Sequence, residues 1–125
     1  MDIELMNWAA VALGTIAAFG LGMIWFSPVM FGKAWAAGSH NIQRPASPPI
    51  LAMLLQFVGT ALLAFVVGMT ETDQAIGTAI GAIFAVALFV GAMGLFSQKT
   101  GKASLIDAGY VVAAGVLMIL SQAIL

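Results

Sequence analysis

Four long apolar runs restrict what this sequence can fold into. They cover residues 5–26, 50–69, 74–97 and 104–125, and every charged residue but Asp107 lies outside them. A helix rises about 1.5 Å per residue, so roughly 20 residues cross a hydrocarbon core of about 30 Å. Because 62% of the residues are hydrophobic and 7% charged, a soluble core of this size could not bury the apolar surface. We predict an all-α integral membrane protein with four transmembrane helices in a single domain, residues 1–125.

A short segment after the first run interrupts the apolar sequence. Pro28 lacks a backbone N–H and disfavours helical backbone at Ser27, so the first helix should end just before them. A new short helix could then begin with Ser27 as its cap and Pro28 as its first residue. Trp25 and Trp35 bracket the segment, and such amphipathic rings prefer the membrane–water interface. We predict an interfacial segment over residues 27–38.

Basic and acidic residues occupy different loops. The first and third loops contain all the basic residues, namely Lys33, Arg44, Lys99 and Lys102, whereas the N-terminus and second loop contain Asp2, Glu4, Glu71 and Asp73. The positive-inside rule then predicts that both termini lie outside the cytoplasm. An asymmetry this clean argues against a small transporter that inserts in both orientations.

Two short segments of the chain resemble each other. Phe26-Ser27 followed by Gly32-Lys33-Ala34 is similar to Phe96-Ser97 followed by Gly101-Lys102-Ala103, with one residue fewer between the parts. A duplication would produce two tandem parallel hairpins related by an axis along the membrane normal. Five matches around a gap can also arise by chance, so both explanations remain open.

Small residues recur every four positions on two of the spans. Gly14, Ala18 and Gly22 form such a stripe on the first span, and Gly77 and Gly81 form one on the third. Small side chains let helix backbones approach closely, although a lone match of this kind is common by chance. These are more packing faces than one four-helix bundle must use. We therefore expect, besides the lipid bilayer, a homo-oligomer or other membrane proteins as partners.

Two motifs resemble a known family. The first is W-x-x-P-x-x-F-G-K-x-W, formed by Trp25, Pro28, Phe31, Gly32, Lys33 and Trp35, and the second is Leu105-Ile106-Asp107-Ala108-Gly109-Tyr110. Together they resemble the bacterial membrane proteins grouped as Domain of Unknown Function family 1761. The resemblance implies a multi-pass protein of the bacterial cytoplasmic (inner) membrane. It transfers no catalytic residue, because the family has no assigned activity.

Side chains that could perform catalysis are scarce. The chain has no cysteine and one histidine, His40, which should lie at the opposite membrane face from most of the acids. An enzyme needs a nucleophile, an acid–base pair or a set of metal ligands. The net charge of −1 gives no reason to expect nucleic acid. We expect no enzymatic activity, no cofactor or metal and no nucleic-acid partner.

Polar side chains inside the spans form a candidate path or cluster. Thr15 and Thr60 should lie near mid-membrane, with Gln56 and Tyr110 about 6 to 8 Å nearer the basic side by helical rise. They could line the polar cavity of a small-solute or ion transporter or channel. They could instead hydrogen-bond between helices, at roughly 0.6 kcal/mol each. Because no ionisable residue lies at the centre of a span, we favour a structural or accessory membrane component over a transporter.

Asp107 is the only acid on the basic side and the only charge inside a predicted span. Ser104-x-x-Asp107 resembles a capping box, which would place the acid at the start of the fourth helix. The alternative is an ion pair, because a carboxylate near hydrocarbon is costly unless it is paired. We prefer Lys33 as its partner, since this pair would connect the interfacial segment to the fourth span.

Overall fold

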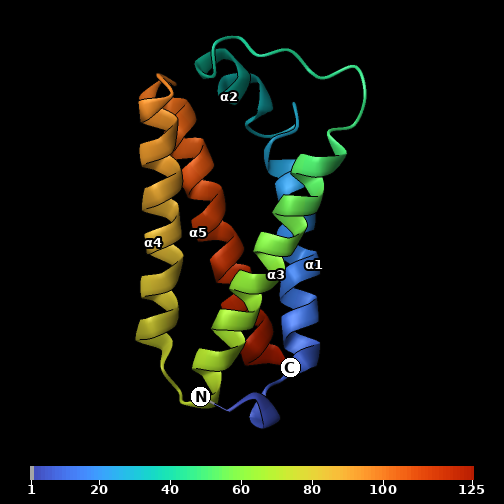
Figure 1. Ribbon diagram of the computed structural model, residues 1–125, viewed down its shortest axis with the longest axis vertical. Coiled ribbons are helices and arrows are strands. Elements are labelled where there is room, and N and C mark those ends of the chain that lie inside the picture. Colours follow the sequence, from blue (N-terminus) through green and yellow to red (C-terminus); the bar gives the residue numbers. More distant parts are fainter. Residues whose placement is uncertain (1) are drawn as a thin grey trace.

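The computed structural model describes residues 2–125, and helices are the only regular elements in that part of the chain (Figure 1). The long helices are α1 (Trp8–Trp25), α3 (Ile50–Thr72), α4 (Ile76–Phe96) and α5 (Gly101–Ile124); the short ones are the 3₁₀ helix η1 (Ile3–Leu5) and α2 (Gly32–Gly38). All four long helices are long and apolar enough to cross a membrane. The predicted all-α fold with four spans is therefore confirmed, and the chain has the helices of a multi-pass membrane protein.

Side-chain caps set the starts of the first and last spans. The Asn7 carboxamide accepts a hydrogen bond from Ala10 N at 3.0 Å, so α1 begins three residues later than the predicted span. The Thr100 hydroxyl accepts one from Ala103 N at 3.1 Å and starts α5 at Gly101. An unpaired helix-end N–H is satisfied in both cases, which is why polar caps decide where a helix begins.

The start of α5 excludes the capping-box interpretation of Asp107. Thr100 already caps the helix, and Asp107 lies nearly two turns inside it. Ser104 is buried, and its hydroxyl makes no hydrogen bond within residues 2–125. The capping box predicted from Ser104 and Asp107 is therefore wrong.

The segment after α1 is a tight turn followed by α2. Phe31 N donates to Trp25 O at 3.0 Å, and Gly32 N donates to Ser27 O at 2.9 Å. A Cβ at Gly32 would lie 2.5 Å from the carbonyl oxygen of Phe26, so only glycine fits this close backbone approach. Because α2 begins at Gly32 with Phe31 at its N-cap, the prediction that Ser27 and Pro28 begin the short helix is wrong.

Helix α5 is the centre of the bundle. It packs along α1 and α4 and also contacts α2, whereas α3 contacts mainly α1. The stripe on α1 faces it: Gly14 lies against Met118, Gly22 against the Tyr110 ring, and Ala18 is fully buried. Small residues on α1 thus allow the close α1–α5 approach.

The stripe of Gly77 and Gly81 on α4 faces away from the bundle. A Cβ added at Gly77 or Gly81 would meet no atom within 4 Å, and both positions are exposed. Packing of this stripe against another helix of the same chain, one form of the prediction, is therefore wrong. Its use between chains stays a prediction.

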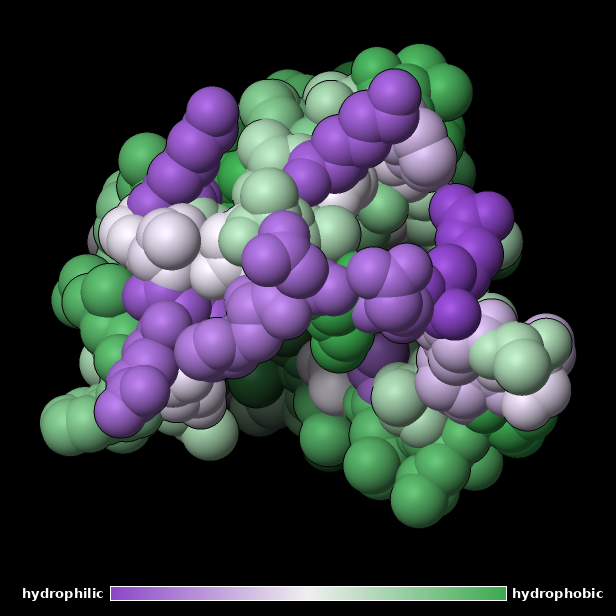
Figure 2. Space-filling view, turned by 90° about the horizontal axis from the view of Figure 1, so that it is seen from above, coloured by the Kyte–Doolittle hydropathy of each residue, from purple (hydrophilic) through white to green (hydrophobic). Residues whose placement is uncertain are grey.

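The two ends of the bundle differ in charge. Figure 2 shows hydrophilic side chains gathered over the end where α2 lies, and the segments between α1 and α3 and between α4 and the first turn of α5, which contain all the lysines and arginines, meet there. Thr100 N donates to Gly38 O at 2.9 Å and joins the two loops. At the opposite end Asp2 N donates to the Thr72 hydroxyl at 3.2 Å. We call these the basic end and the acidic end.

The two similar segments both lie at the basic end. Phe26 and Phe96 are at the ends of α1 and α4, and Gly32 and Gly101 begin the helices that follow. Their helices differ in length, since α2 has 7 residues and α5 has 24. A duplication therefore stays a prediction.

Candidate functional site

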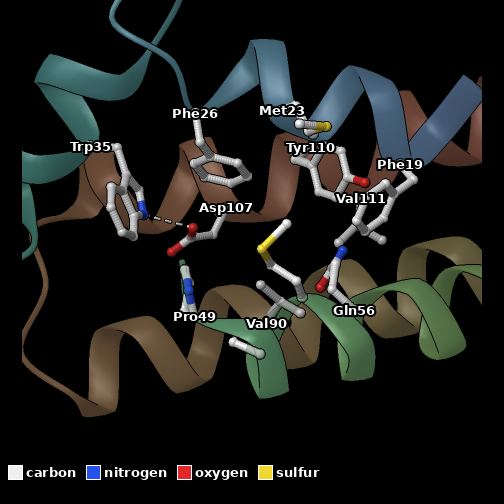
Figure 3. Close-up of a pocket in the computed structure, with 13 residues that line it drawn as sticks. Phe19, Met23, Phe26, Trp35, Pro49, Gln56, Val90, Asp107, Tyr110 and Val111 are labelled. Atoms are coloured by element: carbon white, nitrogen blue, oxygen red, sulfur yellow. Dashed lines mark hydrogen bonds between the residues drawn. The ribbon is translucent and has the colours of Figure 1, made fainter. Parts of the chain in front are cut away.

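A cavity of about 530 Å³ lies between α1, α3 and α5 towards the basic end (Figure 3). Figure 1 shows α1 and α3 diverging from α4 and α5 towards this end, and residues 50–59 of α3 are all exposed. The wall is mostly apolar and includes Phe19, Met23, Phe26, Met53, Val90 and Val111. Small-molecule sites in proteins have volumes of about 300 to 1,000 Å³ and are predominantly apolar. The cavity therefore has the size and lining of a ligand site.

Three of the predicted polar residues line this cavity. Gln56 reaches it from α3, while Asp107 and Tyr110 reach it from α5 (Figure 3). The Tyr110 hydroxyl donates to Ala18 O at 2.7 Å, and the side chains of Gln56 and Thr60 lie next to it. The sequence thus predicted most of the polar groups in this wall.

Thr15 and Thr60, which were also predicted to line a polar path, do not line the cavity. The hydroxyls of Thr15 and Thr60 donate within their own helices, to Val11 O at 2.8 Å and to Gln56 O at 2.7 Å. A threonine that bonds the carbonyl four residues back satisfies its hydroxyl without a partner helix. Both side chains are buried, and neither reaches the cavity.

The Asp107 carboxylate joins three elements at the mouth of the cavity. One oxygen accepts a hydrogen bond from Trp35 Nε1 of α2 at 2.8 Å, drawn as the dashed line in Figure 3. The other pairs with Lys99 Nζ at 3.0 Å, and that ammonium also lies 5.1 Å from the centre of the Trp35 ring. We call Trp35, Lys99 and Asp107 the mouth cluster.

The predicted pair between Lys33 and Asp107 is wrong. The partner is Lys99, which lies two residues before α5 and reaches the second turn of that helix, whereas Lys33 is exposed at the start of α2. The expected connection between the interfacial segment and the fourth span nevertheless exists, through tryptophans: Trp35 bonds Asp107, and Trp25 Nε1 donates to Ile106 O at 3.0 Å. The sequence did contain a signal for Trp35 as a partner of Asp107. An indole N–H can only donate a hydrogen bond, and Asp107 is the one acid on the basic side.

The cavity ends in a packed core towards the acidic end. Ala18 of α1 and Met118 of α5 have 0% and 2% of their surface exposed. Val67 of α3 is equally buried, and a Cβ at Gly68 would lie 2.8 Å from the Val11 side chain. Close packing of this kind excludes water, so the packed core closes the cavity towards the acidic end.

Comparison with known proteins gives one result. No curated protein and no solved structure matches the chain. The family described as "Protein of unknown function (DUF1761)" matches residues 9–121, which include α3, α4, nearly all of α1 and α5, the mouth cluster and every residue lining the cavity. On this match over nearly its whole length, the chain belongs to the DUF1761 family of proteins of unknown function.

Proposed function

We propose that this protein is a non-enzymatic membrane protein that binds a small amphipathic molecule between its helices. We further propose that it is a carrier, and that the structure corresponds to its conformation with the binding site open. The supporting observation is the cavity of about 530 Å³ with an apolar wall and three polar side chains, Gln56, Asp107 and Tyr110. An apolar wall would take up the body of a ligand, and a few fixed polar groups would orient it.

The packed core between the cavity and the acidic end favours a carrier over an open channel. A channel needs a continuous path, but the buried side chains of Ala18 and Met118 fill the bundle below the cavity. Carriers expose their site to one side of the membrane at a time, by moving one group of helices against another. Helix α3 contacts α4 and α5 at few positions, so it is the element we expect to move.

The basic end is the side on which we expect the cavity to open into the cytoplasm. All lysines and arginines lie at this end, between α1 and α3 or between α4 and the first turn of α5, and such residues are concentrated on the cytoplasmic side. With an even number of spans, both termini then lie on the other side of the membrane. The family resemblance suggests a bacterial inner membrane as the location.

The polar groups of the cavity support binding more than catalysis. The Asp107 carboxylate is occupied by Lys99 and by the Trp35 indole. A carboxamide and a phenol, as in Gln56 and Tyr110, form hydrogen bonds but do not exchange protons readily near neutral pH. His40 lies outside the cavity, where its Nε2 is 2.8 Å from Ser97 O.

A substitution that fills the cavity tests the proposal. Ala52 of α3 lines it, and Ala52→Phe should occupy part of its volume without entering the packed core. Ala12→Phe is the matched control, because Ala12 is exposed on α1 and outside the cavity. Small molecules retained by each purified variant would be identified and quantified by mass spectrometry. We expect a molecule bound to the wild type and the control but depleted at least severalfold in Ala52→Phe; equal retention by all three would contradict the proposal.

A second candidate function is that of an accessory component which associates through α4. Gly77 and Gly81 are exposed on the outer face of this helix and leave space for another helix to approach. Close approach at small residues is a common mode of association between membrane helices. The two roles are compatible, because Gly77 and Gly81 do not line the cavity.

A further inference from the structure

A second cavity, of about 710 Å³, lies between α2 and the loop that leads to α3. Lys33 of α2 and Arg44 of the loop both line it, beside apolar side chains that include Phe26, Pro28 and Ile42. In the described part of the chain no aspartate or glutamate contributes to its wall. Two cationic groups without a nearby acid on the same wall create a site of positive potential.

The second cavity adjoins the first. Phe26, Trp35 and Pro49 line both, so these side chains separate a cationic compartment from an apolar one. The carboxylate at this boundary, Asp107, is paired with Lys99 and therefore would not strongly repel an anion. One ligand could occupy both compartments if it had a charged end and an apolar end.

We propose that the two cavities together form a site for an amphiphile with an anionic phosphate headgroup, such as an anionic phospholipid. The phosphate binds between Lys33 and Arg44, and the apolar part extends past Phe26 and Trp35 into the first cavity. This inference rests on the proposed function, because it names the class of molecule that the first cavity binds.

The chemistry of the two basic residues fits a phosphate. An arginine guanidinium can donate two parallel hydrogen bonds to phosphate oxygens, and a lysine ammonium adds a compact charge with three donors. Both side chains are exposed, so a ligand can reach them. Neither forms an ion pair within residues 2–125, which leaves both charges available.

The position of the site favours a membrane amphiphile over a soluble anion. Trp25 and Trp35 flank the segment that contains Lys33, and tryptophans are enriched at the depth of lipid headgroups. A basic residue near an anionic leaflet contributes about 1 kcal/mol to lipid binding. The adjoining apolar cavity would have no occupant if the ligand were inorganic phosphate.

Quenching of tryptophan by brominated lipids tests the inference, because Trp35 lines both cavities. Trp8, which lies at the other end of the bundle, is first replaced by Phe to reduce the background. The protein in detergent is titrated with phosphatidylglycerol or phosphatidylcholine brominated on the acyl chains. We expect half-maximal quenching at a roughly 25-fold lower concentration of phosphatidylglycerol, about fivefold for each of the two charges. Lys33→Gln and Arg44→Gln should each reduce this preference by about fivefold, or 1 kcal/mol per charge.

Lys102→Gln is the matched control, since Lys102 lies at the same end of the bundle but lines neither cavity. A preference that survives in the Lys33→Gln, Arg44→Gln double variant, or that falls equally in Lys102→Gln, would overturn the inference. Displacement of phosphatidylglycerol by equimolar inorganic phosphate would assign the site to a soluble anion instead.

The same titration separates the inference from the proposed function. Suppose that Ala52→Phe reduces quenching by both lipids while Lys33→Gln and Arg44→Gln change nothing. The first cavity then binds an amphiphile, but the two basic residues do not recognise its phosphate, and the inference fails. If Ala52→Phe has no effect on either lipid but still depletes the molecule retained by the purified protein, the inference fails and the proposed function stands; if it changes neither, both fail.

Discussion

The mouth cluster should behave as one energetically coupled unit. Asp107 and Lys99 have 14% and 24% of their side-chain surface exposed, and the carboxylate makes contacts of 2.8 Å to Trp35 and 3.0 Å to Lys99. Hydrogen bonds to charged groups contribute roughly 1.5 to 3 kcal/mol to stability. Asparagine still offers an acceptor to the Trp35 indole but loses the charge. We therefore expect Asp107→Asn to lower the free energy of unfolding by about 2 kcal/mol.

A double-mutant cycle measures the coupling within this cluster. Lys99→Met removes the ammonium from both Asp107 and the Trp35 ring, so its cost should be similar. Because the two changes remove one shared interaction, the double variant should lose less than the sum, by about 1 to 2 kcal/mol. Unfolding in mixed micelles with increasing dodecyl sulfate gives the required free energies. Lys33→Met is the control and should be additive with Asp107→Asn; additivity of Lys99→Met within about 0.5 kcal/mol would refute the coupled cluster.

Three further predictions concern the turn, the oligomer and the topology. Gly32→Ala should lower the unfolding midpoint because the added Cβ would clash with the backbone of Phe26 and Ser27. Gly101→Ala, at the matching position of the similar segment before α5, should leave the midpoint unchanged because its Cβ meets nothing within 4 Å. Gly81→Leu should leave the stability of the monomer unchanged but reduce the mass measured by light scattering if α4 joins two chains; an unchanged mass would show that this face contacts lipid. In cells, Glu71→Cys should react with an impermeant thiol reagent added outside and Ser97→Cys should not, since they lie at opposite ends; equal labelling would indicate mixed insertion.

The sequence alone determined the all-helical class of the protein and the difference in charge between the two ends of the bundle. Apolar runs of helical length can satisfy their backbone groups inside a bilayer only as helices, so the four spans follow from local sequence. The separation of basic and acidic loops likewise needs no tertiary information, because consecutive loops between spanning helices lie at opposite ends of the bundle. Three polar wall residues, Gln56, Asp107 and Tyr110, could be selected because polar groups near a membrane interior are few.

The tertiary structure decided which of these side chains meet. Hydrophobicity does not distinguish one apolar helix from another within the bilayer, so the sequence could not indicate that α5 lies at the centre or that the α4 stripe faces outward. The choice of Lys99 over Lys33 as partner of Asp107 depends on where the Thr100 cap starts α5 and on the direction in which Trp35 points. The first cavity depends on the divergence of α3 from α5, and the second on the position of the loop before α3 over α2, so both bring together residues from separate parts of the chain.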